Sequence, residues 1–290
     1  MEIAKLFIAN HNKLYSELAM IKNRVKIEKD QKPSIEMYTI WLKENHDIQI
    51  TGSTGRHYES VARDVKEQLE CSIFWVNIAT KLKEFEEEYQ LTTDGYELFM
   101  DLDAPKIKTK PWSSFIEKTF RKNILNNSNW PNAPNEGWVL PENWLSNIND
   151  IVRTKFVVKY LDGVEFLMNK LALNGESCGL VCEKSWEARD EGYYALHMNI
   201  RQNYLVKEMN WTEETKIISF EIQITTQLQD VIRRLLHEDY EEKRTERVAD
   251  EKWQWNYKSE EFSTNYLGHI LHYVEGMIMD VREKGRGGFK

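Results

Sequence analysis

The stretch KIISFEIQITT at Lys216–Thr226 decides the fold, because its residues from Ile218 to Thr225 alternate strictly between apolar and polar. Side chains alternate across a β-strand, so the stretch predicts a strand that buries one face. Glu221 and Gln223 then project together from the polar face. An ordinary half-buried strand shows the same alternation, so this pattern alone establishes a strand and not a site. The apolar face consists of Ile218, Phe220, Ile222 and Ile224.

Three more stretches before this one read as strands. IVRTKFVVKY (Ile151–Tyr160) is rich in the β-branched residues that strands favour. GLVCEK (Gly179–Lys184) is a shorter apolar run, and YYALHMNI (Tyr193–Ile200) repeats the alternation with His197 and Asn199 on its polar face. Apolar residues at helical spacing lie between and after these strands. The expected helices run from about Val164 to Leu173, from Leu228 to Tyr240 and from about Tyr266 to Glu283.

The N-terminal part has helical periodicity, first from Ile3 to Ile21 and then in one amphipathic pattern from about Tyr58 to Leu91. Three prolines and eight asparagines between Asn126 and Asn149 predict a long loop. We therefore expect an α/β (α+β) fold, with a mixed β-sheet flanked by helices and helical additions at both ends. The expected parts are an appendage at 1–60, a catalytic domain at 61–250 and a helical extension at 251–290.

The last helix carries a continuous apolar stripe that includes Leu267, Leu271 and Val274. So much apolar surface is not left in water on a soluble protein. The stripe is therefore expected to cover either the catalytic domain or a second subunit of a homo-oligomer.

The composition excludes several classes of protein. The 290 residues include 34 aromatic ones, which is incompatible with a disordered chain. The chain has no apolar run long enough for a membrane helix, and its first residues do not resemble a secretory signal. Three cysteines cannot form a disulfide framework, so we expect a cytoplasmic protein. A net charge of -8 argues against indiscriminate nucleic-acid binding.

Carboxylates at two strands favour a metal site. Asp150 lies at the start of the Ile151–Tyr160 strand, and Glu221 projects from the polar face of the later one. Mg²⁺ binds few protein carboxylates and completes its shell with water and phosphate oxygens. A lone aspartate at a strand end is more often simply solvated, so the hypothesis depends on Asp150 and Glu221 lying close together.

A basic segment, KIKTKPWSSFIEKTFRK at Lys106–Lys122, lies within this acidic chain. Lys118, Arg121 and Lys122 would share one face of a short helix. Ser113 or Ser114 could cap that helix, whose N-terminus attracts phosphate. The segment is either a solvated cationic face or a cradle for a triphosphate.

These segments, in this order, resemble the motifs of the RelA/SpoT nucleotidyltransferase family, the alarmone synthetases. The resemblance covers about residues 70 to 245, and its specificity comes from five motifs in order rather than from any single one. KTKPWSSFIEK (Lys108–Lys118) corresponds to R-V-K-S-P-x-S-I-x-x-K, DIVRTK (Asp150–Lys155) to D-I-x-G-I-R, EGYYALH (Glu191–His197) to N-G-Y-R-S-L-H, EIQITT (Glu221–Thr226) to E-I-Q-I-R-T, and His237, Tyr240 and Lys243 to H-x-x-Y-x-x-K.

The resemblance implies a nucleotidyltransferase-like fold and transfer of pyrophosphate from ATP to the 3′-hydroxyl of GDP or GTP. Asp150 and Glu221 would hold Mg²⁺, and Gln223 would help to orient the attacking hydroxyl. Tyr193 would stack on the acceptor base, and His197 would contact the acceptor phosphates. The residues implied for ATP binding are Lys108, Lys110, Ser114, Lys118, Arg121, Arg153 and Lys155.

Departures from the motifs leave the acceptor open. Tyr194 and Thr225 stand where the family pattern has arginine, which removes two planar phosphate-binding groups. The alternatives are a toxic synthetase that modifies the 3′ CCA end of tRNA or makes adenosine alarmones, with an antitoxin as partner, and a degenerate module that only binds nucleotide. No match to the hydrolase domain of the long relatives is found, so no hydrolase activity is expected.

Overall fold

The computed structural model describes residues 31–208, 212–244 and 253–287, with side chains given except at 236–244 and 286–287. The helical periodicity at Ile3–Ile21 and the side chains of His237, Tyr240 and Lys243 lie outside this description. By their internal contacts the residues form two units. The smaller comprises the residues before Ile50 together with Phe120–Trp138, and the larger comprises Ile50–Thr119 and the chain from Val139 onward.

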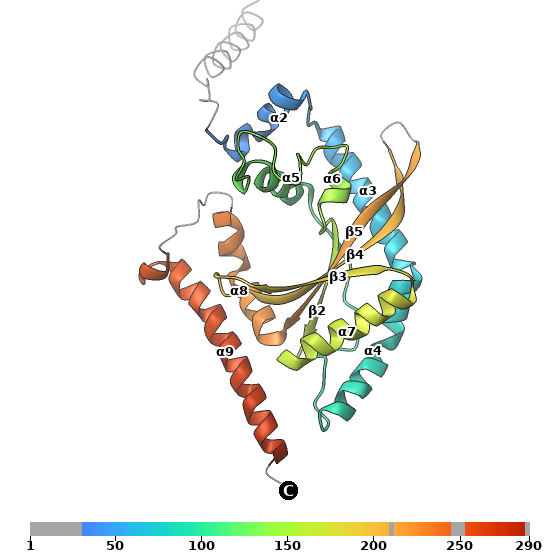
Figure 1. Ribbon diagram of the computed structural model, residues 1–290, viewed down its shortest axis with the longest axis vertical. Coiled ribbons are helices and arrows are strands. Elements are labelled where there is room, and N and C mark those ends of the chain that lie inside the picture. The colour runs from blue at the N-terminus through green and yellow to red at the C-terminus, as the bar shows by residue number, and fades with distance from the viewer. Residues whose placement is uncertain (1–30, 209–211, 245–252, 288–290) are drawn as a thin grey trace, which may run out of the picture. The chain divides into compact units, whose positions relative to one another are not determined.

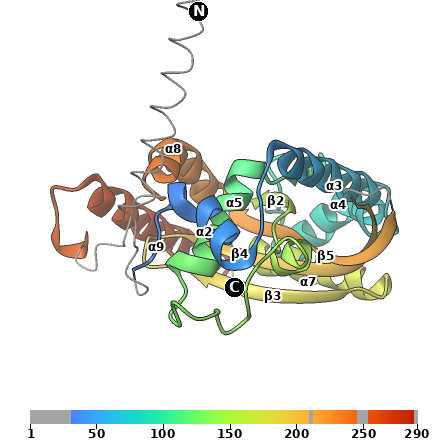
Figure 2. The ribbon, with the colours of Figure 1, turned by 90° about the horizontal axis from the view of Figure 1, so that it is seen from above.

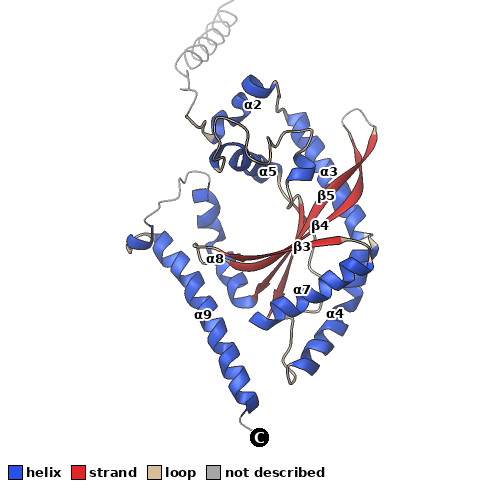
Figure 3. Ribbon diagram, viewed as in Figure 1, coloured by secondary structure: helices blue, strands red, loops and turns tan. Residues whose placement is uncertain are grey.

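The larger unit is built on a mixed five-stranded sheet, which confirms the expected fold class (Figures 1 and 3). The strand order is β1-β2-β5-β4-β3, and only the β2–β5 pair is parallel. The strands are β1 (Lys108–Thr109), β2 (Val152–Val158), β3 (Val181–Ala188), β4 (Tyr194–Lys207) and β5 (Glu213–Thr226). The helices are α3 (Gly52–Glu70), α4 (Ile73–Thr92), α5 (Trp112–Phe120), α6 (Trp144–Asn147), α7 (Leu161–Ser177), α8 (Gln227–Arg244), the 3-10 turn η3 (Trp253–Trp255) and α9 (Glu260–Gly287).

The predicted strands and the later helices are present, with β4, β5 and α9 longer than expected. The single helical pattern from Tyr58 to Leu91 is in fact two helices, α3 and α4, which run along the same flank of the sheet (Figure 2). The break occurs because Ser72 caps α4, its Oγ accepting from the backbone N–H of Trp75 at 3.2 Å. The loop expected between Asn126 and Asn149 contains the short helix α6.

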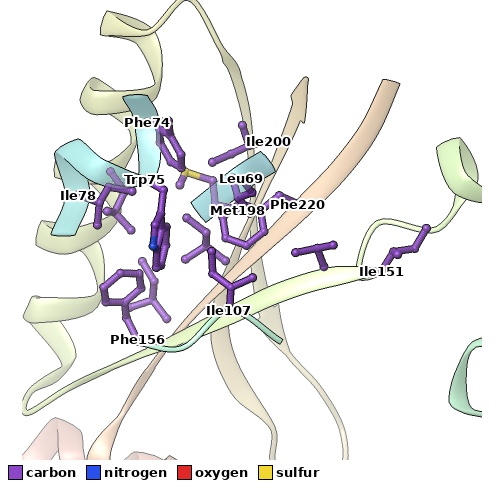
Figure 4. Packing of buried hydrophobic residues seen from close by; sticks show 14 of the residues in the cluster. Leu69, Phe74, Trp75, Ile78, Ile107, Ile151, Phe156, Met198, Ile200 and Phe220 are labelled. Carbon is purple, nitrogen blue, oxygen red and sulfur yellow. The ribbon is translucent and has the colours of Figure 1, made fainter. Parts of the chain in front are cut away.

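The core lies between the apolar face of the sheet and the helices α3, α4 and α7. Ile218, Phe220, Ile222 and Ile224 are all fully buried, as the alternation of β5 predicts. Trp75 of α4 meets Phe220 edge-on, with the ring centroids 6.0 Å apart. Figure 4 shows these two rings among Leu69, Phe74, Met198 and Ile200. One face of the sheet is thus buried against these helices, and the polar side chains of the strands lie on the other face.

The smaller unit is a cluster of aromatic side chains. It contains the 3-10 turn η1 (Ile35–Met37), helix α2 (Tyr38–His46) and the π-helical turn η2 (Arg121–Leu125). Tyr38 packs against Trp41 and Phe120, and its hydroxyl accepts from Asn123 Nδ2 at 2.8 Å. Within the described residues no helix has the length and apolar character needed to cross a membrane.

Phe220→Ala should lower the free energy of unfolding by about 3–5 kcal/mol, because it leaves a cavity beside Trp75. Urea denaturation followed by tryptophan fluorescence measures the change. Leu91→Ala on α4 is the matched control, since Leu91 is 84% exposed, and it should change stability by less than about 0.5 kcal/mol. Equal effects of the two variants would contradict the assigned core.

Candidate active site

Two rows of polar side chains cross the sheet opposite the core, because each strand alternates in register with its neighbours. The first row contains the predicted Glu221 and the second contains Gln223 and His197. The first row runs Lys108, Arg153, Glu221, Asn199 and Glu183, and the second runs Lys155, Gln223, His197 and Ser185.

Asp150 lies in the turn before β2, outside both rows, and it is 6% exposed. Lys118 Nζ donates to its Oδ1 at 2.8 Å, and Lys110 Nζ donates to its Oδ2 at 3.0 Å. Arg153 NH1 lies 3.7 Å from the same Oδ2. Burial alone would raise the pKa of Asp150, but the charges and hydrogen bonds of Lys118 and Lys110 outweigh it and hold the pKa well below its usual value. Asp150 is therefore ionised at neutral pH.

Lys110 is fixed by its backbone as well as by this ion pair. Its N–H donates to the carbonyl of Ile151 at 2.8 Å, and its carbonyl accepts from the Tyr58 hydroxyl at 2.9 Å. The side chain is as buried as Asp150, and this burial lowers the pKa of Lys110. Lys110 and Asp150 neutralise each other, and the further positive charge comes from Lys118 and Arg153. We call Lys110, Lys118 and Arg153 the cationic wall.

Glu221 is the second buried carboxylate, 7% exposed. Gln223 Nε2 donates to its Oε1 at 2.5 Å, and His197 Nδ1 lies 3.5 Å from its Oε2. Burial raises the pKa of Glu221, and so does the negative charge of Asp150, but the hydrogen bond and charge of His197 together with the Gln223 bond leave the pKa below its usual value. The negative charge of Asp150 is among the influences that raise the pKa of Glu221. That the two carboxylates hold one metal ion stays a prediction.

The donor set of this site suits a hard divalent cation. Asp150 and Glu221 provide oxygen ligands, and the neighbouring Asn199 has a buried Oδ1 that accepts no hydrogen bond from any described residue. A cation that prefers oxygen, such as Mg²⁺, is compatible with these groups. No cluster of three or more His, Cys, Asp or Glu ligands occurs in the described part of the chain, so a closed site formed by such residues alone is not found there.

Tyr193 and His197 lie together on the acceptor side proposed from the sequence. The Tyr193 hydroxyl is 2.7 Å from His197 Nε2, and the guanidinium groups of Arg189 and Arg233 lie 5.2 and 4.4 Å from the centroid of the tyrosine ring. Arg233 NH1 also donates to the Tyr193 hydroxyl at 3.3 Å. An aromatic ring with two guanidinium groups over it forms a cationic surface.

The other basic residues implied for ATP binding form no contact with Asp150 that the structure records, and each lies on a different element. Lys108 is exposed on β1 opposite Arg153. Lys155 forms an ion pair with Asp230 of α8. Arg121 begins η2, in the smaller unit. The chain there forms a π turn, in which Asn126 N donates to Arg121 O at 2.8 Å.

The expected serine cap of this helix is wrong. α5 begins at Trp112, and the carbonyl of Pro111 accepts the first helical hydrogen bond, from Phe115 N at 2.9 Å. Ser113 and Ser114 therefore lie inside the first turn rather than before it. Ser114 is half-buried there, two residues after the start of α5.

Helix α9 packs against the loop that carries Tyr193. Gly192 and Gly268 meet backbone to backbone, so that a Cβ at position 268 would lie 2.3 Å from the carbonyl oxygen of Gly192. His269 accepts from the Tyr194 hydroxyl through Nδ1 at 2.8 Å and donates to the carbonyl of Asp190 through Nε2 at 2.9 Å. His272 stacks on the Tyr194 ring with centroids 3.7 Å apart. The loop Asp190–Tyr194 is thus held by the C-terminal helix.

Sequence reasoning did not identify Arg189, Arg233, Asp230 or the two histidines of α9. Arg189 carried a weak signal, since a basic residue shortly before an aromatic one in a loop can lie against it. Arg233 and Asp230 could be assigned only once the direction of α8 over the polar face was known. For His269, the signal would have been its position directly after Gly268, because a glycine within a helix can mark a close contact with another segment.

Asp150→Asn should remove a stability contribution that depends on pH. The pKa of Asp150 is depressed in the folded state, so this contribution is fully present above about pH 3.9, the unfolded value, and is lost as the pH falls through the folded value. At pH 7 the variant should be less stable by about 3 kcal/mol, because Lys110 is left buried without its partner. Urea unfolding at pH 7 and pH 3 measures the difference in free energy of unfolding between the wild type and the variant, which should be smaller at pH 3. A difference that is the same at both pH values, or as small as that of the exposed control Glu67→Gln, would contradict the assignment.

Gly268→Ala should destabilise the contact between α9 and the Asp190–Tyr194 loop by about 1–3 kcal/mol, because the added methyl group has no room. Gly276→Ala on the same helix is the matched control, since a Cβ there meets nothing within 4 Å. It should be neutral or stabilising by up to about 1 kcal/mol. Calorimetric unfolding of both variants measures the difference, and equal melting temperatures would refute the close packing.

Comparison with known proteins identifies the fold of this chain. No protein-family model matches the sequence, and no curated protein matches it significantly. The small alarmone synthetase 1 from Bacillus subtilis is similar in structure, with a TM-score of 0.50 and 13% identity over 80% of this chain and 98% of that one. The same synthetase bound to its product pppGpp gives a TM-score of 0.51 and 14% identity over 79% and 96%. The chain therefore has the fold of the small alarmone synthetases.

Proposed function

We propose that this protein is a pyrophosphokinase that transfers pyrophosphate from ATP to the ribose 3′-hydroxyl of a guanosine nucleotide, GDP or GTP. The observation that carries the proposal is the pair of ionised, buried carboxylates Asp150 and Glu221 beside a cationic wall. The fold supports it, since the similar synthetase 1 has been solved with bound pppGpp. In this reaction the 3′-oxygen attacks the β-phosphorus of ATP, the bond from that phosphorus to the α–β bridging oxygen breaks, and AMP leaves.

Asp150 and Glu221, with Asn199 beside them, would hold Mg²⁺ on the ATP phosphates. The ion would neutralise the charge of the transferring group when it is bound. Gln223, through its hydrogen bond to Glu221, would fix that carboxylate and help to orient the attacking hydroxyl.

Lys110, Lys118 and Arg153 would bind the triphosphate. All three approach the Asp150 carboxylate, and phosphate oxygens are acceptors of the same kind. Phosphoryl-type transfer depends mainly on positioning and charge neutralisation, which such a wall supplies. Lys108, Lys155 and Ser114, which belong to the same unit, are candidates for further phosphate contacts.

The acceptor would bind at Tyr193 and His197. Arg189 and Arg233 add two guanidinium groups there, which favours an acceptor that carries phosphates of its own. Arg189 and Arg233 offset the absence of arginine at positions 194 and 225. Their positive charge therefore favours GDP or GTP as the acceptor over a ribose that carries few phosphates. We place the activity in the cytoplasm, where its nucleotide substrates are.

A second candidate is a toxic synthetase that modifies the 3′ end of tRNA or an adenosine nucleotide and is neutralised by an antitoxin. The feature that favours it is Tyr194, which stands where the resemblance expects arginine and which contacts His269 and His272 of α9.

Incubation with γ-labelled ATP and, in separate reactions, GDP, GTP, ATP and deacylated tRNA decides between the two. Label should pass to GDP or GTP with release of AMP. Transfer to tRNA would weaken steeply between about 50 and 200 mM salt through counterion release, whereas transfer to a nucleotide should change less. Label found only on the tRNA 3′ end would contradict the leading proposal, and label on no acceptor would favour a degenerate binding module.

Glu221→Gln should reduce the transfer rate at least about a hundredfold, about 2.7 kcal/mol of barrier, because the metal loses a carboxylate ligand. Glu183→Gln is the matched control, since Glu183 lies in the same row of the sheet on the exposed edge strand. It should keep nearly full activity. Circular dichroism checks that both variants fold, and near-wild-type turnover by the Glu221 variant would eliminate the assigned mechanism.

A further inference from the structure

Helix α9 packs on the larger unit with its polar side. The residues that it buries there are Asn265, Gly268, Glu275 and Arg282. The apolar stripe predicted from the sequence is largely exposed, as at Leu267 and Val274. The stripe therefore does not cover the protein's own catalytic domain, which was one of the two expectations for it. What α9 brings to the catalytic domain is instead a set of polar groups.

The tyrosine proposed to bind the acceptor base, Tyr193, lies in the turn that joins β3 to β4. Inside the turn, Arg189 N donates to the carbonyl of Tyr193 at 3.0 Å, and Gly192 N donates to the carbonyl of Arg189 at 2.9 Å. Asp190 and Glu191 at its tip are exposed, and β3 is the edge strand of the sheet. A short exposed turn at the edge of a sheet needs outside contacts to keep one shape.

His269 of α9 supplies such contacts at both ends of the turn. Its Nε2 donates to the carbonyl of Asp190 at 2.9 Å, and its Nδ1 accepts from the Tyr194 hydroxyl at 2.8 Å. Because a carbonyl oxygen can only accept, Nε2 carries the hydrogen, and Nδ1 is left to accept from the hydroxyl. One planar ring thus sets the distance between two residues that flank Tyr193.

The position of His269 is itself fixed by the end of the sheet. Gln229 is 2% exposed, and its Nε2 donates to the carbonyl of the adjacent Gly268 at 3.2 Å. One turn before the middle of the contact ends, the Thr226 hydroxyl donates to the buried carboxylate of Glu275. The helix is therefore anchored on the end of β5 and the start of α8, and β5 also carries a carboxylate proposed for the metal.

Anchoring Tyr194 determines where Tyr193 points. The Tyr194 ring stacks on His272 of α9 with the centroids 3.7 Å apart, and its carbonyl accepts from the Thr225 hydroxyl at 3.2 Å. Successive side chains of a strand project to opposite faces. With Tyr194 held on one face, Tyr193 is presented on the other, where its hydroxyl lies 2.7 Å from His197 Nε2.

We propose that His269 is a positioning residue for the acceptor nucleotide. It acts without touching the nucleotide, by holding the turn in the shape that lets Tyr193 stack on the base. A surface that is already ordered binds more tightly, because less conformational entropy is lost when the ligand arrives. His269 should therefore affect the acceptor and not ATP, since the cationic wall lies on other elements. This inference deepens the proposed function and rests on it.

Initial rates with varied GDP at saturating ATP test this role. His269→Ala should raise the KM for GDP about fivefold or more and change kcat and the KM for ATP by less than about twofold. His269→Gln, whose amide keeps a donor and an acceptor, should recover part of the loss. Tyr273→Ala is the matched control, at a 71% exposed residue of the same helix, and it should leave the KM for GDP unchanged. An unchanged KM for GDP in His269→Ala, or a loss confined to kcat, would overturn the proposal.

Tyr194→Phe is a milder variant that keeps the test decisive if His269→Ala does not fold. It removes one of the two hydrogen bonds to His269 and leaves the ring free to stack on His272. The KM for GDP should rise about two- to threefold. Tyr273→Phe removes an exposed hydroxyl from the same helix and should have no effect. Equal KM values for the two variants would contradict the role of His269.

Hydrogen exchange of the peptide covering residues 189–194, measured without substrates, tests the holding of the turn separately from activity. The amides of Arg189 and Gly192 should exchange several-fold faster in His269→Ala than in the wild type, and no faster in Tyr273→Ala. Exchange that is unchanged by His269→Ala would refute the positioning. If the wild type transfers label to neither GDP nor GTP, the proposed function and the acceptor role fall together, whereas the exchange still decides whether His269 holds the turn.

Discussion

The buried ion cluster of Asp150 with Lys110 and Lys118 is the constraint on which the rest of the site depends. An ionised carboxylate placed out of water is costly unless charged donors meet both of its oxygens, as these two lysines do. The cluster joins the turn before β2, the end of β1 and helix α5, three segments distant in sequence. It therefore fixes the start of the parallel strand pair while also gathering positive charge where a triphosphate could replace the carboxylate as partner.

A second constraint is the close approach of α9 to the loop before β4. Two glycines permit this contact, and two histidines then reach Tyr194 and the Asp190 carbonyl. On the buried polar side of this helix, Arg282 forms an ion pair with Asp162, and Glu275 accepts a hydrogen bond from the Thr226 hydroxyl. As a result the apolar side of α9 faces outward, which reverses the usual arrangement of a surface helix.

Much of the sheet and of its polar face could be predicted, because the alternation of apolar and polar residues in a strand can be read from a few consecutive residues. The alternation in β5 and β4 gives the buried face directly, and it places Glu221, Gln223 and His197 on the other. The pairing of β2 with β5 is not a local pattern, so the sequence could suggest that Asp150 and Glu221 lie close together only through the motif order. The break between α3 and α4 was missed because apolar spacing continues across Ser72. Arg189 and Arg233 were missed because they reach Tyr193 from a loop and a helix that are distant in sequence. The buried face of α9 was predicted wrongly because hydrophobic periodicity favours burial of the apolar face.

We expect the lysines around Asp150 to exchange this carboxylate for the phosphates of a magnesium nucleotide. Calorimetric titration with a non-hydrolysable ATP analogue, with and without Mg²⁺, measures this exchange. Binding should require Mg²⁺ in the wild type, and Lys118→Ala should weaken it at least about tenfold, about 1.4 kcal/mol. Affinity that is unchanged by removal of Mg²⁺ and by loss of the Lys118 ammonium group would contradict the account.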